Sequence, residues 1–290
     1  MPPLEIPHRF KGKLHEIHDK RLFFSGRMPS ADWGSHATIN TPPVFPLLSN
    51  LIPKSLDPEH SSAILNAADH YHNGQFTIFD IPYNAGSEIH WHRDPKTGKE
   101  WPLKFWTDID IRDGFAIGGP KFVWEINRLY CLNVLGIAYR ITKDEKYAAK
   151  FFEILSSWLE ANPYAQGVNW TSGIELSVRI ANLIWGLSNF RERGLSGKET
   201  EQVCQFDWLH GRHLCRYPSK YSSNNNHAIA EAFALFLIGV CFPHFPEAGK
   251  WRAFGQKVLD REVERQILPD GGSYEYTTTY LSFVFDFFLL

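Results

Sequence analysis

Apolar residues recur at helical spacing throughout the second half of this chain, and no other feature limits its fold as strongly. From Gly119 onward, separate sets of apolar residues follow steps of three and four positions. Such steps place the residues of each set along one face of a helix. The sets are Phe122, Ile126, Leu129 and Leu132; Tyr147, Phe151, Ile154 and Trp158; Ile174, Val178, Ala181 and Trp185; and Ile229, Phe233, Phe236 and Val240. No β-strand alternation of comparable length competes with them, so we expect an all-α body.

Capping and breaking signals agree with these stripes. Segments 142–145 (Thr-Lys-Asp-Glu) and 196–199 (Ser-Gly-Lys-Glu) are capping boxes, in which side chains satisfy the free amides of a starting helix. Asn162-Pro163, Gly194 and Pro243 interrupt the helical pattern. Together these signals predict about six or seven helices of about fifteen to twenty residues, with short connections that favour antiparallel hairpins.

The first part of the chain differs in composition from the rest. Before about residue 116, Pro, Gly, His and Asp are frequent, and only Pro58 to Tyr71 shows a plain helical pattern. We therefore expect residues 1–115 to form a loop-rich segment with at least one helix, packed on a helical domain of residues 116–290. The stretch from Tyr280 to Leu290 begins an apolar helix without a C-cap, which predicts a chain that stops inside a larger architecture.

Charge and hydropathy exclude several classes of protein. The 290 residues include 30 basic and 32 acidic side chains, a net charge of −2, so no overall field attracts nucleic acid or an anionic membrane. No run of about eighteen apolar residues is present, and Met1–Glu5 does not begin a signal peptide. The sequence as given therefore indicates a cytoplasmic protein, or a periplasmic or secreted one if it is a processed fragment.

Cysteines and aromatic residues are informative mainly through their distribution. Cys131, Cys204, Cys215 and Cys241 are widely spread in apolar or helical stretches, so we expect buried free thiols. Aromatic residues make up 15% of the chain. They indicate either a large aromatic core or surfaces that stack on sugar rings, and the composition leaves both open.

The most unusual local sequence is Ser222-Ser223-Asn224-Asn225-Asn226-His227, directly before an apolar helix that begins near Ala228. Ser and Asn are favoured helix caps, so one interpretation is a redundant N-cap. Three consecutive asparagines exceed what one cap requires. A helix N-terminus also concentrates free amides and positive potential, which suits a carboxylate or sulfate ligand. In that interpretation Asn226 and His227 add side-chain donors to the same site.

A second candidate region follows the turn at residues 269–272 (Pro-Asp-Gly-Gly), where Ser273 could cap the next helix. On that helix Tyr276 and Tyr280 are four positions apart and share a face, with Glu275 to one side. These side chains either edge a core or, for a tyrosine beside cationic or amide donors, transfer protons.

Other motifs point to ordinary structural roles. His90 and His92 would lie on one side of an extended segment, but no third ligand follows at convincing spacing, so we expect no metal. An i, i+4 ion pair accounts for Glu175 and Arg179. The chain has no G-x-G-x-x-G, P-loop, G-x-S-x-G or H-E-x-x-H motif. Nucleotide-dependent, serine-hydrolase and zincin activities therefore lack support, and no cofactor is expected.

Taken in order, these motifs resemble the heparinase II/III-like family of polysaccharide lyases, which includes related alginate lyases. The resemblance extends from about residue 75 to the end of the chain. Its segments are residues 91–98 with Trp101-Pro102; residues 121–128; Asn169-Trp170 with Glu175 and Arg179; Asn225-Asn226-His227; and Asp270 to Tyr280. The resemblance implies an incomplete α/α toroid of antiparallel helical hairpins, which in relatives is followed by an antiparallel β-sandwich that lies beyond this sequence.

The reaction implied by the resemblance is β-elimination at a uronic acid, which cleaves the glycosidic bond at C4. Removal of the weakly acidic C5 proton requires stabilisation of the charge that develops on the adjacent carboxylate. By resemblance, Asn226 with His227 would bind this carboxylate, and Tyr280 would give a proton to O4 or take one from C5. One hairpin repeat separates Asn226 from Tyr280, which could bring both to one rim of the toroid. In the family, a further catalytic histidine or tyrosine comes from sequence beyond the helical region.

Five more residues are predicted to bind substrate: Asn225, Trp170, Arg179, Glu275 and Tyr276. Trp170 lies in a loop between two helices, and we expect it to face the cleft and stack on a sugar ring. Arg179 would supply positive charge for an anionic substrate. The alternative is that Trp170 packs in the core and Arg179 only pairs with Glu175.

The predicted partner is therefore an anionic polysaccharide or oligosaccharide that contains uronic acid, and a homodimer is a possible assembly. Two other functions stay open. The same site could remove the C5 proton and return it from the opposite face, as a uronyl C5-epimerase does. If part of the site is lacking, the chain would be a non-catalytic scaffold that binds anionic glycans.

Overall fold

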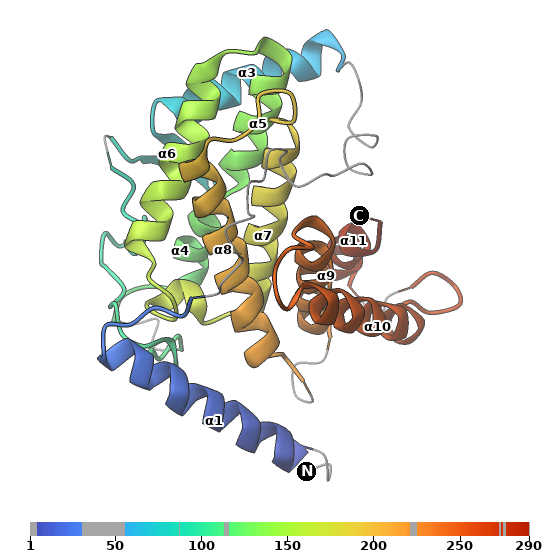
Figure 1. The fold of residues 1–290 in the computed structure, drawn as a ribbon. Coiled ribbons are helices and arrows are strands. Elements are labelled where there is room, and N and C mark those ends of the chain that lie inside the picture. Colours follow the sequence, from blue (N-terminus) through green and yellow to red (C-terminus); the bar gives the residue numbers. More distant parts are fainter. Residues whose placement is uncertain are drawn as a thin grey trace. The chain divides into compact units, whose positions relative to one another are not determined.

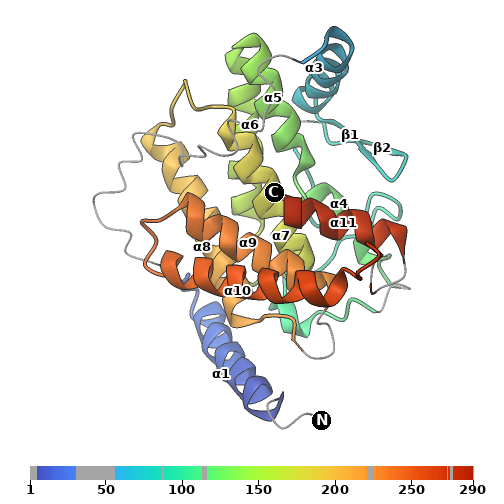
Figure 2. The ribbon, with the colours of Figure 1, turned by 90° about the vertical axis from the view of Figure 1, so that its right-hand side faces the viewer.

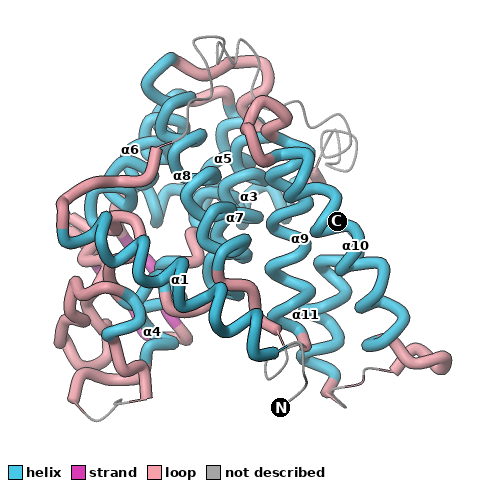
Figure 3. Tube along the Cα trace, turned by 60° about the horizontal axis from the view of Figure 1, so that its bottom comes forward, coloured by secondary structure: helices cyan, strands magenta, loops and turns pink. Residues whose placement is uncertain are grey.

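The computed structural model describes residues 5–30, 56–86, 88–112, 116–220, 225–272, 274 and 277–289. These residues are largely helical, and their strands form one short hairpin (Figures 1 and 3). The chain divides into two compact units. Unit 1 comprises Met1–Gly34, Ser172–Val178 and Asp207–Leu290, and unit 2 comprises Ser35–Thr171 and Arg179–Phe206. No helix in the described ranges is both long and apolar enough to cross a membrane.

Unit 2 is built mainly from the helices of the middle of the chain. Its small antiparallel sheet pairs Gln75 with Asn84 at one end and Ile78 with Ile81 at the other. The division between the units falls inside two helices, α7 (Gly173–Ser188) and α8 (Gly197–Arg216). The other elements of unit 2 are α3 (Pro58–His72), β1 (Gln75–Ile78), β2 (Ile81–Asn84), α4 (Pro120–Asn127), α5 (Tyr130–Thr142), α6 (Glu145–Ala161) and the short 3₁₀ turns Trp106–Asp108 and Val168–Trp170.

Helix α6 illustrates how the periodic stripes specify unit 2. The predicted stripe residues Tyr147, Phe151, Ile154 and Trp158 are all buried. Phe151 also packs edge-on against Phe190, with ring centroids 4.9 Å apart. Burying one face of a helix in this way contributes most of its stability in a protein of this size. The prediction of this helix is confirmed.

Of the two predicted capping boxes, one is confirmed and one is shifted. The Glu199 amide donates to Ser196 Oγ (3.3 Å), and the Ser196 amide donates to Glu199 Oε2 (2.7 Å), as a capping box requires. At the other, Thr142 still belongs to α5, and its hydroxyl donates to a carbonyl one turn earlier. Asp144 caps α6 instead, because its carboxylate accepts a bond from the Lys146 amide at 2.9 Å.

The predicted stripe over residues 122–132 is divided between two helices. Helix α4 ends at Asn127 and α5 begins three residues later, because Leu129 adopts a left-handed backbone with φ of +59°. The Asn127 side chain is fully buried at this break. Its amide donates to Trp91 O (2.9 Å), and its Oδ1 accepts a bond from Trp158 Nε1 (2.8 Å). The break therefore coincides with a buried polar contact that an apolar pattern does not reveal.

Unit 1 contains a second set of hairpin helices, α9 (Asn226–Cys241), α10 (Ala248–Gln266) and α11 (Thr278–Leu289). Gly239 of α9 lies against the start of α10, and Gly255 of α10 lies against the middle of α9, so these helices are antiparallel and closely packed. Helix α11 then runs in the same direction as α9 (Figure 2). The two are joined by Phe233 and Phe287, whose ring centroids are 5.1 Å apart.

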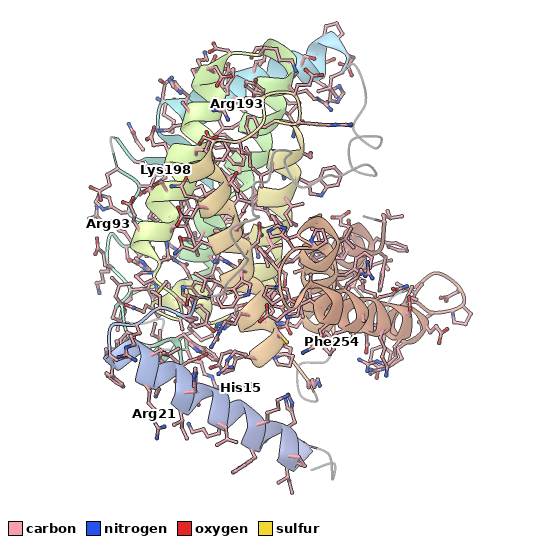
Figure 4. The ribbon with its side chains drawn as sticks, viewed as in Figure 1. His15, Arg21, Arg93, Arg193, Lys198 and Phe254 are labelled. Carbon is pink, nitrogen blue, oxygen red and sulfur yellow. The ribbon has the colours of Figure 1, made fainter. Side chains whose placement is uncertain are left out.

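A long helix, α1 (Glu5–Phe24), occupies a region for which the sequence predicts only loops and short elements. Ile6, Phe10 and Leu14 follow helical steps but are all exposed, so no buried stripe marks the helix. On the side of α1 that faces the end of α8, His15 Nδ1 lies 3.1 Å from Arg216 O (Figure 4). The expected boundary between residues 115 and 116 stays a prediction.

The cysteines follow expectation with one exception. All four are free thiols, and Cys131, Cys204 and Cys241 are buried. Cys215 is exposed, so its expected burial is wrong. It lies one residue before the end of α8, where the helix face turns to solvent.

Candidate functional site

The asparagine run precedes and begins α9. Asn225 occupies the N-cap position, but its side chain makes no capping bond to the first turn. Its backbone carbonyl instead accepts bonds from the amides of Ala228 (3.0 Å) and Ile229 (3.4 Å). Redundant side-chain capping therefore does not account for Asn225. The N-terminus of this 16-residue helix carries the positive potential that suits an anion.

Asn226, the first residue of α9, is nearly fully enclosed. Its side chain is 4% exposed, and its Oδ1 has no hydrogen-bond partner within the described part of the chain. A buried polar atom without a partner costs about 1–3 kcal/mol. Because an amide oxygen accepts hydrogen bonds, a hydroxyl or another donor of a ligand would complete it, whereas an anion would be bound by the amide nitrogen.

His227 follows directly and is half-buried. Burial lowers the pKa of His227, and the nearby carboxylate of Glu175, in the first turn of α7, acts in the opposite direction. Because burial dominates, the imidazole is neutral at neutral pH and offers one donor and one acceptor.

Tyr280 lies in the first turn of α11 and is 47% exposed. Its backbone amide donates to Thr277 Oγ1 at 3.0 Å, which caps the start of this helix. Phe287 follows Tyr280 by seven residues, as Phe233 follows Asn226, and the two phenylalanine rings are in contact. Since α9 and α11 run in the same direction, their first turns lie at the same end of unit 1 (Figure 2).

Two predicted substrate-binding residues, Glu275 and Tyr276, lie outside the described residues, as do Ser222, Ser223, Asn224 and Ser273.

The expected exposure of Trp170 is wrong. Its side chain, in unit 2, is 1% exposed, and its ring packs against Tyr164 (centroids 5.2 Å apart) and Trp158 (6.1 Å). These two aromatic neighbours hold the indole in the core of the unit. The ring therefore offers no surface for a sugar in this structure.

Arg179 is also fully buried in unit 2. Its guanidinium donates to Asn127 O (2.7 Å) and Asn169 O (3.1 Å), and it lies over the ring of Trp158 at 4.5 Å. Carbonyl and aromatic partners of this kind accommodate a buried cation. These contacts give Arg179 a structural role, and no part of its side chain faces solvent for an anionic substrate.

The histidines considered for metal binding lie in a structural turn. His92 Nε2 is 2.9 Å from Ala161 O, and burial lowers the pKa of His92. Asp94 closes the turn by accepting bonds from the amides of Lys96 (2.8 Å) and Thr97 (2.9 Å). Across the described ranges, no group of three or more His, Cys, Asp or Glu side chains is arranged to hold a metal ion.

One residue near the asparagine run was missed by sequence reasoning. Glu231 is buried on α9, four residues after His227, and accepts two hydrogen bonds from Ser219. Burial raises the pKa of Glu231 to about 7, although the two bonds from Ser219 act to lower it. The available signal was a single acidic residue inside the apolar stretch Ala-Ile-Ala-Glu-Ala-Phe.

Comparison with known proteins gives consistent results. A model of the family described as Heparinase II/III N-terminus matches residues 54–289. Similar curated proteins include the heparin-sulfate lyase of Bacteroides stercoris, 26% identical over 224 residues (68% of this chain, 29% of that protein). Another is the heparin-sulfate lyase of Bacteroides thetaiotaomicron, 35% identical over 161 residues (52% and 22%). The chain thus spans less than a third of the length of these relatives.

Solved structures show the same fold. Heparinase III has a TM-score of 0.60 at 23% identity, covering 79% of this chain and 33% of its own. The heparan sulfate lyase HepC of Pedobacter heparinus has a TM-score of 0.56 at 18% identity, covering 91% and 41%. The predicted all-α, α/α-toroid fold is therefore confirmed.

Proposed function

Because the chain belongs to the heparinase II/III N-terminal family, we propose that it forms the toroid part of a polysaccharide lyase. The lyase would cleave anionic, uronic-acid-containing glycans of the heparan sulfate type by β-elimination. The names of the related lyases support this substrate class. The observation that carries the proposal is the place of Asn226, a buried amide at the N-terminus of α9. Its Nδ2 group would donate to the uronate carboxylate, and its Oδ1, which has no partner among the described residues, would accept a sugar hydroxyl.

The chemistry requires charge stabilisation before proton removal. When the C5–H bond breaks, negative charge develops on the uronate carboxylate; a double bond then forms between C4 and C5 as the C4–O4 bond breaks. The first-turn amides of α9, the Nδ2 group of Asn226 and the neutral His227 imidazole would donate to that carboxylate. Donors held in place by a helix lower the barrier because they need no rearrangement during the reaction.

Tyr280 would transfer protons in this reaction, either from C5 or to the departing O4. An exposed phenol in the first turn of α11, at the same end of unit 1 as Asn226, supports this role. As a phenolate it would accept the C5 proton, and as a phenol it would protonate the departing O4. Asn225 would bind the glycan beside Asn226, and Glu275 and Tyr276 stay predicted contacts of the same region.

The test is the reaction of the full-length protein with heparan sulfate, followed by the ultraviolet absorbance of the unsaturated uronate. We expect product with the wild type, and at least about a 10²-fold loss of kcat for Asn226→Ala and for Tyr280→Phe. Circular dichroism should show unchanged helix content in both variants. A fully active Tyr280→Phe variant would contradict the proton-transfer role.

Two further measurements with the same protein and heparan sulfate separate the alternative functions. Deuterium that enters C5 from heavy water without chain cleavage would identify a uronyl C5-epimerase. Salt-sensitive binding of heparan sulfate without any product would identify a glycan-binding scaffold.

A further inference from the structure

Glu231 is a buried acidic residue that the proposed chemistry does not use. Its side chain is 3% exposed. The carboxylate accepts the Ser219 backbone amide at 2.7 Å and the Ser219 hydroxyl at 2.6 Å. Removing a carboxylate from water is costly unless it is hydrogen-bonded. A packed apolar side chain would avoid this cost, so the residue type points to the contact with Ser219 rather than to packing.

The Ser219–Glu231 contact brackets the candidate site along the chain. Ser219 lies in the segment that leaves α8, seven residues before Asn226. Glu231 lies four residues after His227 and so on the same face of α9. The contact thus closes a loop of chain that carries Asn225, Asn226 and His227. The first turn of α9 is thereby joined to the segment that leads into it.

The first turn of α7, which belongs to the same unit, covers the carboxylate from another side. A Cβ built on Gly173 would overlap the Glu231 carboxylate, so only glycine leaves room there. Ser177 donates its hydroxyl to Gly173 O at 2.8 Å. Glu175 in the same turn acts electrostatically on His227. The carboxylate is therefore enclosed by α9, by the start of α7 and by the segment after α8.

We propose that Glu231 is a positioning residue of this site: by holding Ser219, it keeps Asn226 and His227 in the arrangement that binds the uronate carboxylate. This inference rests on the function proposed above. Glu231 touches no reacting atom in this role and acts through the first turn of α9. A displacement of about 1 Å in such a group lowers a rate by up to about 10²-fold, so the contact has a measurable effect on turnover.

The first test changes either partner of the contact in the full-length protein. Glu231→Gln and Ser219→Ala should each lower kcat on heparan sulfate by about tenfold or more, with KM changed by less than about threefold. Ser219→Thr keeps both donors and should restore most of the rate. Asp19→Asn is the matched control, because Asp19 is a buried carboxylate that holds the same end of α8 from α1. Equal kcat losses in Asp19→Asn and Glu231→Gln would overturn the proposal.

The second test leaves both partners unchanged. Gly173→Ala should displace the carboxylate and reproduce the kcat loss. Gly249→Ala, where an added Cβ meets nothing within 4 Å, is the control and should keep full activity. In the Glu231→Ala background, Gly173→Ala should cause little further loss, because the group it displaces is gone. Fully additive losses would contradict the inference.

Amide hydrogen exchange distinguishes failure of this inference from failure of the proposed function. Glu231→Gln should raise exchange across residues 217–220 and 225–229, whether or not the protein cleaves a glycan. If the wild type is inactive and exchange still rises in the variant, the proposed function is overturned, but the Ser219–Glu231 contact is shown to hold this segment. An active wild type, with exchange and kcat unchanged in the variant, would overturn the positioning role.

Discussion

Two contacts near the end of α8 each use a buried carboxylate, and the two carboxylates behave in opposite ways: Asp19 of α1 and Glu231 of α9. At the first, Asp19 accepts bonds from Arg212 (2.9 Å), Arg216 (3.1 Å) and the Tyr217 hydroxyl (2.8 Å). Burial alone would raise the pKa of Asp19, but these donors, together with His18, hold it well below its usual range.

At the second contact, Glu231 accepts two hydrogen bonds from Ser219, which lies two residues after Tyr217. Burial raises the pKa of this carboxyl to about 7, because a neutral serine offsets only part of the burial. The comparison shows that two carboxylates with little solvent exposure behave in opposite ways when only one of them has cationic partners. Near the end of α8, the Asp19 carboxylate therefore stays charged at neutral pH, whereas the Glu231 carboxyl changes its charge there.

The largest expected effect is the loss of the Asp19 contact. Asp19→Asn leaves Arg212 and Arg216 without their carboxylate and should lower the free energy of unfolding by about 3–5 kcal/mol at pH 7. Because the folded pKa is lowered from 3.8, this stability is present above pH 4 and is lost as the pH falls below it. Urea unfolding at pH 7 and pH 3 measures both effects. The exposed Asp260→Asn is the control and should change stability little.

Glu231→Gln should have the opposite pH dependence. The folded pKa is raised from 4.5 to about 7, so the wild type loses stability as the pH rises through this interval, by roughly 3 kcal/mol in total. The glutamine variant lacks this pH dependence, so its free energy of unfolding should rise relative to that of the wild type between pH 5 and pH 8. Urea unfolding at these two pH values measures the difference. An unchanged difference between variant and wild type would mean that Glu231 is not a buried acid with a raised pKa.

The smallest expected effect concerns one donor of the Asp19 contact. Tyr217→Phe removes the hydroxyl that donates to Asp19 and leaves both arginines in place, so we expect a loss of about 1 kcal/mol. Tyr274→Phe, at an exposed tyrosine, should have no effect on the melting temperature. A loss for Tyr217→Phe as large as that for Asp19→Asn would show that the hydroxyl, and not the cations, holds the carboxylate.

Helices that bury one face could be predicted from the sequence, and helices that do not could not. The stripe from Tyr147 to Trp158 is local and periodic, and it predicted α6 correctly. Helix α1 was missed although Ile6, Phe10 and Leu14 follow helical steps, because charged and histidine side chains outnumber the apolar ones along it. The break at Leu129 was missed because it depends on Asn127, whose partner Trp158 lies 31 residues away.

The candidate site shows the same limit. The asparagine run before α9 is unusual by composition alone, and so Asn226 could be singled out. Trp170 could not be placed, because a tryptophan in a loop looks the same whether it is exposed or packed on Trp158 and Tyr164. The contact between Ser219 and Glu231 joins residues 12 positions apart and leaves no period in the sequence.

The exposed thiol of Cys215 makes the end of α8 directly observable. All four cysteines lie in the described ranges, and the other three are buried. Within this chain, a thiol-reactive dye should therefore label Cys215, one residue before Arg216. Its fluorescence would report any loosening of this end in real time, without an engineered attachment site.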